Sequence, residues 1–222
     1  MRDRVSQALA LILGLFVFWT AAAGAFEALE QRALFLGLVT TLGFTLYPLG
    51  AGTSWRRIGL AVDLALTGVA LAACGYIVWN YETIMGSLPW ATTTDIVLTA
   101  GLLIAVLELG RRTVGLIFPV LVTLGLAYAL LGGSLPGALG HRGFDIAFVT
   151  ETVFLGDLGI WGMLTGVAAT VIAAFVLFGA LLLHSGGGQA FMDLAMRLGG
   201  RQPGGAAKIA TRFCASGLSL RP

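Results

Sequence analysis

Six stretches of about 20 predominantly apolar residues follow one another along this chain of 222 residues. An α-helix needs about that length to cross the ~30 Å hydrocarbon core of a bilayer, where every backbone polar group must be bonded within its own segment. Hydrophobic residues make up 58% of the sequence and charged residues 11%, which excludes a water-soluble globular protein. The pattern predicts an all-α, polytopic membrane protein. The predicted spans are residues 5–25, 33–49, 58–79, 92–109, 113–131 and 159–183.

The basic residues assign an orientation to these spans, because Lys and Arg are retained on the cytoplasmic side during insertion. Eleven of the thirteen fall on one side if six spans alternate, which leaves only Arg32 and Arg142 outside. Both chain ends are therefore predicted to be cytoplasmic. The eleven are Arg2, Arg4, Arg56, Arg57, Arg111, Arg112, Arg197, Arg201, Lys208, Arg212 and Arg221. Four tryptophans fall near the predicted outer interface, where an amphipathic indole is favoured: Trp19, Trp79, Trp90 and Trp161.

The first predicted span has a competing interpretation as a signal peptide. A basic start and an apolar core precede a small-residue cleavage site at Ala23, Gly24 and Ala25. The apolar run is long enough to cross the membrane, so we expect it to be retained. Cleavage stays open, and it would leave the entry of the next span from the outer side unchanged.

Asp63 and Glu108 are acidic residues inside predicted spans, and a carboxylate in a membrane raises the hypothesis of an ion or proton site. Both lie near the cytoplasmic ends of their spans, whereas coupling-ion sites usually lie near the midplane. Glu108 precedes Arg111 and Arg112 by three and four residues, the spacing of helical ion pairs. We therefore expect these acids to form structural ion pairs with arginines at the inner interface.

The outer segment of residues 132–157 is too long for a minimal turn, and long ordered loops tend to be functional. It carries His141, Arg142 and Asp145. Two interpretations stay open: a docking surface for an extracytoplasmic partner, or a polar cap that folds over the helices. A zinc site is not expected, because His141 has no second ligand at suitable spacing.

No motif in the sequence supports enzyme chemistry, and none indicates a resident cofactor. The net charge of +2 gives no reason to expect a nucleic-acid partner. The "GMLTG" sequence of residues 162–166 fits the motif that lets two membrane helices approach backbone to backbone, and it indicates packing only. Membrane lipid is the one partner that the composition itself requires.

The segment of residues 176–210, "VLFGALLLHSGGGQAFMDLAMRLGGRQPGGAAKIA", resembles the start of the large membrane subunit of tripartite ATP-independent periplasmic (TRAP) transporters. In that family a span ending in "LFG" leads through a Ser-Gly turn into an amphipathic helix and then a "GG-x-AK" element. "GRRTVGLIFP" at 110–119 and "LPGALGHRGF" at 135–144 are similar to upstream elements of the family. The resemblance is closest to the fused permeases of the branch that works with TAXI-type solute-binding proteins.

The resemblance implies three parts: residues 1–112 as a four-helix portion like the small subunit, 113–158 as a linking helix and outer loop, and 159–222 as the start of the large transport subunit. It also implies solute uptake across a bacterial inner membrane, coupled to Na+ or H+. A periplasmic TAXI-type binding protein would dock on the outer face, where His141, Arg142 and Asp145 are the candidate contacts.

Family members continue into a Gly/Ser-rich hairpin that holds ion and substrate. The sequence is expected to be an incomplete N-terminal part that ends before this remainder of the transport domain and does not transport by itself. Asp193 and Arg197 are spaced to pair along the amphipathic stretch of residues 189–198. Residues 208–210 are expected to begin a seventh span. The alternative is a non-transporting membrane scaffold or assembly subunit, and an importer driven by ATP is disfavoured by the short inner connections.

Overall fold

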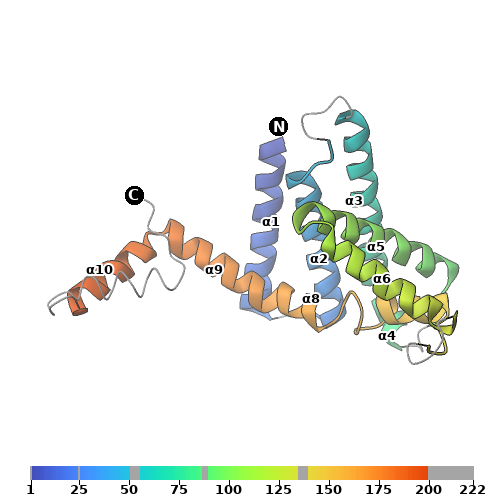
Figure 1. Cartoon of the computed structure of the whole chain (residues 1–222). Coiled ribbons are helices and arrows are strands. Elements are labelled where there is room, and N and C mark those ends of the chain that lie inside the picture. The colour runs from blue at the N-terminus through green and yellow to red at the C-terminus, as the bar shows by residue number, and fades with distance from the viewer. Residues whose placement is uncertain (1, 25, 51–55, 87–89, 135–139, 200–222) are drawn as a thin grey trace. The chain divides into compact units, whose positions relative to one another are not determined.

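The computed structural model describes residues 2–24, 26–50, 56–86, 90–134 and 140–199, and these form helices and connections without a strand. Two compact units, Met1–Ala174 and Phe175–Pro222, are described separately. The elements are α1 (Arg2–Ala23), α2 (Ala28–Leu46), α3 (Arg56–Trp79), α4 (Tyr81–Gly86), α5 (Thr93–Thr113), α6 (Ile117–Leu131), η1 (Gly132–Ser134), α7 (Ile146–Thr150), η3 (Glu151–Leu155), α8 (Met163–Val167), η4 (Ala168–Ile172), α9 (Ala173–His184) and α10 (Gly187–Gly199) (Figure 1).

Five helical stretches of the described residues are long and apolar enough to cross a membrane, which confirms the predicted class of polytopic helical membrane protein. The sixth predicted span, residues 33–49, falls on α2. This helix has Glu30, Gln31 and Arg32 close to its start, and it is not among the five stretches. The five stretches are Arg4–Ala23, Arg57–Trp79, Thr93–Thr113, Ile117–Ser134 and Met163–His184.

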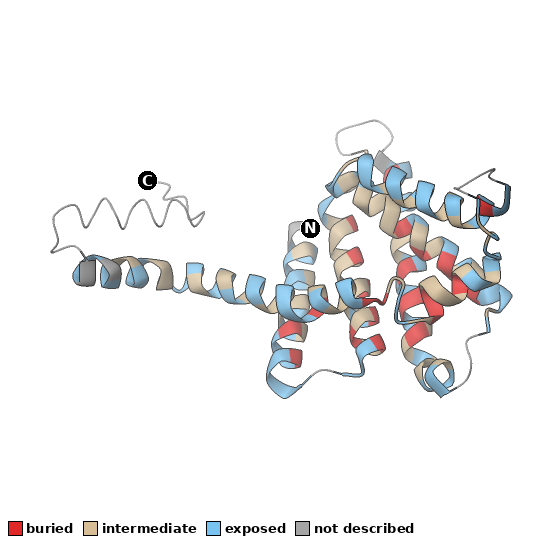
Figure 2. Ribbon diagram, turned by 60° about the horizontal axis from the view of Figure 1, so that its bottom comes forward, coloured by how far each residue is buried: buried red, intermediate tan, exposed pale blue. Residues whose placement is uncertain are grey.

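The α2 helix is the central helix of the first unit, packing against α1, α3 and α5 (Figure 1). Its buried residues, among them Ala33, Gly37 and Phe44, are shielded by these neighbours (Figure 2). Thr40 is 1% exposed, and its hydroxyl donates to the Leu36 carbonyl at 2.8 Å, so no polar atom of this side chain is left unpaired. Small side chains whose polar atoms bond within their own helix let membrane helices pack closely.

The α5 helix begins with a capping box and ends in an antiparallel turn to α6. The Thr92 side chain accepts from the Asp95 N–H, and the Asp95 carboxylate accepts from the Thr92 N–H at 2.8 Å. This reciprocal arrangement satisfies N–H groups that the first helical turn leaves free. At the other end Gly115 has φ +103°, a conformation that glycine adopts readily, and it reverses the chain into α6.

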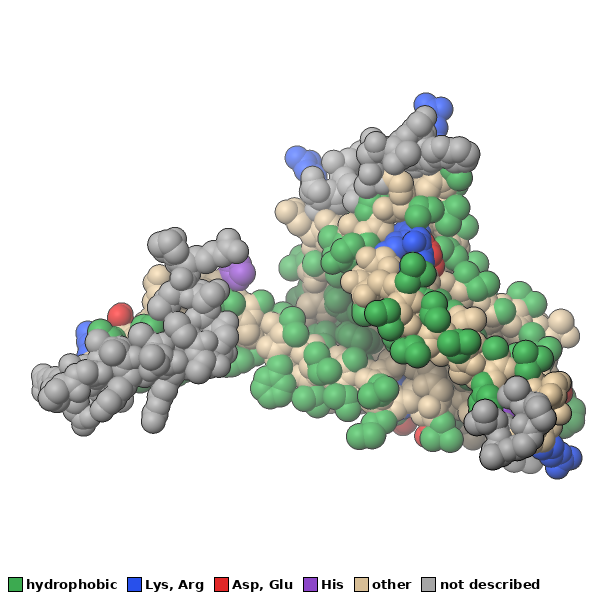
Figure 3. All heavy atoms as spheres, in the orientation of Figure 1, with side chains coloured by type: hydrophobic (Ala, Val, Ile, Leu, Met, Phe, Trp, Pro, Cys, Tyr) green, Lys and Arg blue, Asp and Glu red, His purple; other side chains and the backbone are tan. Residues whose placement is uncertain are grey.

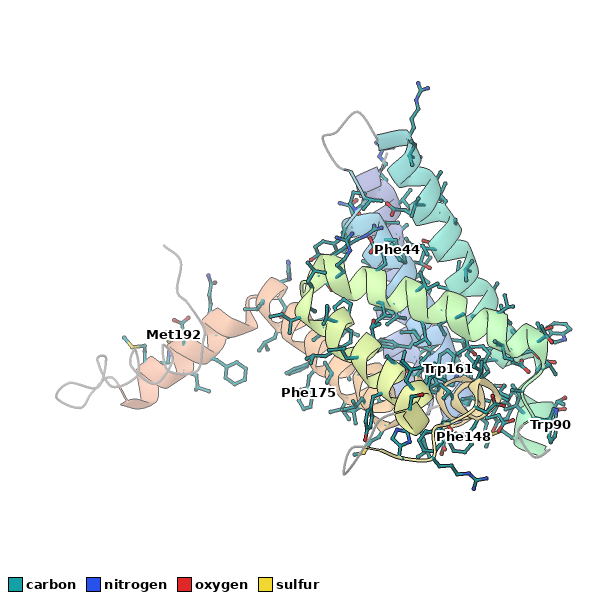
Figure 4. The ribbon with its side chains drawn as sticks, turned by 45° about the vertical axis from the view of Figure 1, so that its right-hand side comes forward. Phe44, Trp90, Phe148, Trp161, Phe175 and Met192 are labelled. Carbon is teal, nitrogen blue, oxygen red and sulfur yellow. The ribbon has the colours of Figure 1, made fainter. Side chains whose placement is uncertain are left out.

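Most of the described residues in the outer segment that follows α6 are helical. Residues 146–155 form α7 and the π-helical turn η3, and Phe154 and Leu155 of this turn are buried against the core. Trp161, which was predicted near the outer water interface, is buried within the protein. Its side chain is 0% exposed, and its indole N–H donates to the Phe154 carbonyl at 2.6 Å (Figure 4). The indole therefore packs in the core of the first unit and is shielded from lipid and water.

The other predicted interface tryptophans are exposed: Trp19, Trp79 and Trp90 are 62%, 89% and 84% exposed. Hydrophobic side chains cover most of the visible face of the first unit, and charged side chains gather near the ends of its helices (Figure 3). This distribution suits a bundle whose sides contact lipid and whose ends contact water.

The second unit contains most of α9 and the amphipathic α10. The amphipathic stretch predicted for residues 189–198 falls within α10 and is helical. Gly186 has φ +76° and separates the two helices. The basic residues Arg201, Lys208, Arg212 and Arg221, and the predicted start of a seventh span at residues 208–210, lie outside the described residues.

Candidate functional site

Charged residues from α3 and α5 meet at the predicted inner end of the first unit. Arg112 Nη1 donates to Asp63 Oδ1 at 2.6 Å, although the two residues are separated by 49 positions. The side chains of Arg112 and Asp63 are 7% and 8% exposed, so this ion pair is buried. The described ion-pair partner of Asp63 is thus an arginine from another helix.

Further contacts hold this pair in place. Arg112 Nη1 also donates to the Tyr47 carbonyl at 2.9 Å, and the guanidinium lies 5.1 Å from the centroid of the Phe44 ring. The backbone N–H of Leu49 donates to Asp63 Oδ2 at 3.0 Å. Arg112 and Asp63 therefore tie together the adjacent ends of α2, α3 and α5. Each carboxylate oxygen of Asp63 thus accepts from a different segment of the chain, which is the structural ion pair that we expected.

Glu108 forms the ion pairs that its spacing predicted. Its two oxygens accept from Arg111 Nε and Nη2, each at 2.7 Å, which is a bidentate arrangement. Oε1 also accepts from Arg112 Nε at 2.8 Å. The Arg111 side chain is 42% exposed, whereas that of Arg112 is buried, so the two contacts differ in environment.

At the predicted outer end, His141 bonds to the backbone where the chain turns back after α6. Its Nε2 lies 3.0 Å from the Tyr128 carbonyl, and its Nδ1 accepts from the Gly143 N–H at 3.0 Å. This pattern assigns the neutral tautomer with the proton on Nε2. The ring lies edge-on to Tyr128 and against Gly132, where a Cβ would overlap it. Both ring nitrogens are therefore engaged within the chain.

Arg142 and Asp145 follow His141 and are exposed. Asp145 is the N-cap of α7, and its carboxylate accepts from the Ile146 N–H at 2.9 Å. The three predicted docking residues thus lie on one connection, with His141 fixing the backbone that presents the other two.

Contacts between distant segments join the outer ends of the helices. The Tyr81 hydroxyl donates to Glu27 Oε2 at 3.2 Å, and Glu151 Oε1 accepts from the Ala91 N–H at 3.0 Å. Desolvation and the hydrogen bond to Glu27 raise the pKa of the Tyr81 phenol above its ordinary value. The hydrogen bond from the Ala91 N–H to Glu151 joins the outer segment to the connection that precedes α5.

Asp95 is a buried carboxylate that the sequence analysis missed. It is 2% exposed, and its Oδ1 has no hydrogen-bond partner among the described residues. Asp95 also lines a small cavity of about 140 Å3 with Tyr76, Asn80 and Trp90. The spacing of Thr92 and Asp95 is a capping-box signal that could have placed this acid at the helix start.

The predicted pair of Asp193 and Arg197 lies on α10 with both side chains exposed, and these two described side chains form no ion pair. An exposed pair one turn apart contributes only about 0.3–0.5 kcal/mol, so water competes with it effectively. Among the described residues no group of three His, Cys, Asp or Glu side chains is placed to hold a metal ion.

These helices define a multi-pass helical membrane protein, with an ion pair that joins α3 and α5 at the predicted inner end. Residues 102–217 match the family model described as "Tripartite ATP-independent periplasmic transporter, DctM component". Because this match covers more than half of the chain, the chain belongs to that family of transporter components. No curated protein and no solved structure matches it.

Membership confirms the resemblance to TRAP transporters at the level of the family. It implies a periplasmic solute-binding protein and membrane lipid as partners. The match begins within α5, upstream of residue 159, where the sequence prediction places the start of the large subunit.

Proposed function

We propose that this chain is a membrane permease component of a secondary solute uptake system, driven by a Na+ or H+ gradient across a bacterial inner membrane. The observation that carries this proposal is the match of residues 102–217 to the DctM component of TRAP transporters. That region includes α6 to α10 and most of α5, so it covers several of the membrane-crossing stretches. The ion pairs at the inner end give the chain a scaffold and supply no reaction centre.

Residues 1–112 form the small-subunit-like portion in this proposal, fused to the large subunit in one chain. The four helices α1, α2, α3 and α5 support it, because they pack into one unit with α2 at its centre. Residues 113–158 are then the link and 159–222 the beginning of the transport portion. Fusion places the two portions next to each other without a separate association step.

The outer connection after α6 is the proposed contact for a TAXI-type binding protein. Arg142 and Asp145 are exposed, charged and close in sequence, while His141 is bonded to Tyr128 and Gly143. We assign His141 the role of holding this connection, and Arg142 and Asp145 that of contacting the partner. Exposed charges at the edge of an interface affect the association rate and its salt dependence most strongly.

A binding measurement tests the docking surface. A TAXI-type binding protein, whose gene we expect near this one, is immobilised, and the detergent-purified chain is added at two salt concentrations. Arg142→Glu and Asp145→Lys should each weaken Kd about five- to tenfold at low salt, with a smaller effect at high salt. Arg57→Glu is the matched control, since Arg57 is exposed at the opposite end. Unchanged Kd for both outer variants would contradict the assignment.

Uptake by cells tests the transport function itself. Deletion of the gene should abolish uptake of the solute held by that binding protein, and a plasmid copy should restore it. Collapse of the Na+ gradient or of the H+ gradient, one at a time, should identify the coupling ion. Unchanged uptake after deletion, together with a stable complex containing the chain, would contradict the proposal and favour a scaffold.

A further inference from the structure

A cavity of about 540 Å3 lies in the first unit, at the predicted outer ends of its helices. Its walls come from the start of α2, from Phe26 before it, and from residues 157–170, which include α8. The walls are mainly apolar, and Leu158 and Met163 are 83% and 80% exposed at this site. The polar side chains of the lining include Gln31, Arg32 and Asp157.

Arg32 is a cation without an acidic partner among the described residues. Its Nη1 donates to the Trp161 carbonyl, and its Nε and Nη2 lie against Gly166 of α8. A Cβ on Gly166 would be 2.9 Å from Nε, so the glycine of the "GMLTG" motif makes room for the guanidinium. A guanidinium has five N–H donors, and the Trp161 carbonyl accepts from Nη1 alone.

Gln31 adds a second unused donor in the same cavity. The residue is 3% exposed, and its Nε2 has no hydrogen-bond partner in the described part of the chain. A buried donor without an acceptor is costly, so such a group indicates a missing partner. Gln31 and Arg32 are adjacent at the start of α2, and both line the cavity. The site therefore lacks an acceptor, and the charge of Arg32 favours an anionic one.

The depth of the site identifies the source of that anion. Arg32 is the fifth residue of α2, and a rise of 1.5 Å per residue places it about 6 Å from the start of the helix. In the predicted orientation this end of α2 faces the outer leaflet, and long basic side chains commonly reach toward the interface of headgroups and acyl chains. Exposed apolar side chains beside a cation suit an amphiphile better than a fully hydrated solute.

We propose that this cavity binds the headgroup of a phospholipid from the outer leaflet, with phosphate oxygens accepting from Arg32 and Gln31. Asp157 lines the same cavity and is exposed. Its carboxylate selects a headgroup that carries an ammonium, such as ethanolamine, over a purely anionic one such as glycerol. The bound lipid fills a groove between α2 and α8 and satisfies the unpaired amide. This site is independent of solute transport.

Native mass spectrometry of the purified chain tests the proposal. The protein is exchanged into micelles that contain phosphatidylethanolamine, phosphatidylglycerol or no phospholipid, and retained lipid is counted. We expect retention of phosphatidylethanolamine to fall about tenfold in Arg32→Gln, since a hydrogen bond to a charged group changes an affinity by about that factor. Arg142→Gln is the matched control, because it removes the other predicted outer arginine without touching the cavity. Equal retention by wild type and Arg32→Gln overturns the proposal.

If Arg32→Gln does not fold, the Gln31→Leu variant provides a second test of the same site. Leucine has a similar size and removes the buried donor, so the variant should fold and should still retain less lipid. Full retention by this variant overturns the role of Gln31. Displacement of lipid by millimolar succinate or inorganic phosphate would show a solute site and would overturn the lipid assignment. Equal retention of the two phospholipids would overturn the role of Asp157.

Discussion

Arg112 of α5 lies 2.6 Å from Asp63 of α3, and both side chains are buried. Asp63→Asn removes the buried carboxylate partner of Arg112 and leaves Glu108, which Arg111 shares, as its acidic contact. Loss of one partner of a buried pair costs about 3–5 kcal/mol. The midpoint of thermal unfolding in detergent, followed by circular dichroism, should fall clearly. Arg111→Gln is the control, because Arg111 pairs with Glu108 at an exposed site, where a pair contributes at most about 1 kcal/mol. Equal midpoints for the two variants would contradict this account.

Two glycines should respond in opposite ways to the same substitution. A Cβ on Gly37 would lie 3.5 Å from Cys74, an ordinary contact, so Gly37→Ala should be neutral or stabilising by up to about 1 kcal/mol. A Cβ on Gly59 would overlap the backbone carbonyl of Leu49. Gly59→Ala should therefore push the start of α3 away from Leu49 and lower the unfolding midpoint. A lower midpoint for Gly37→Ala than for Gly59→Ala would show that the helices pack differently.

Trp161 and Trp79 should contribute very differently to stability. Trp161 is 0% exposed, and replacing a buried tryptophan with alanine costs about 3–5 kcal/mol. Trp79 is 89% exposed, so Trp79→Ala should change the free energy of unfolding in detergent little. Chemical unfolding of both variants in the same detergent compares them directly. If Trp79→Ala lowered the free energy of unfolding strongly and Trp161→Ala did not, Trp161 would not be a core residue.

The orientation rests on the distribution of basic residues and can be tested by labelling. Single cysteines at positions 57 and 142 are introduced into a chain whose Cys74 and Cys214 are replaced by alanine. An impermeant maleimide added to whole cells should label position 142 and spare position 57, and inverted vesicles should give the reverse. Labelling of both positions from one side would require an even number of crossings between them and would contradict the predicted orientation.

The spacing of residues along α5 was sufficient to predict the ion pairs at the predicted inner end that involve Glu108. Glu108 lies three and four residues before its arginine partners, so the helix itself brings them together. The pairing of Arg112 with Asp63 depends on how α3 and α5 pack, and no local pattern contains that information. Family membership was predictable for the same reason as the local pairs, because the residues that carry it form short contiguous motifs.

The same distinction explains what the sequence did not predict. Trp161 occupies a position where an interface residue is expected, but the turn of η3 folds the chain so that its indole meets the Phe154 carbonyl. Asp95 lies in a predicted span, and its burial depends on contacts with α3 and η3. The cavity beside Arg32 likewise requires Gly166 to lie next to α2, which the glycine motif indicated only as packing.

The polar start of α2 has a consequence for how the chain is made. An isolated segment carrying Glu30, Gln31 and Arg32 partitions poorly from the translocon into lipid, since each charge opposes transfer by up to about 3 kcal/mol. We expect α2 to integrate efficiently only together with α1 and α3, which an insertion assay on α2 alone and on the three helices together would measure. The helix that organises the finished bundle is then the one least able to enter the membrane by itself.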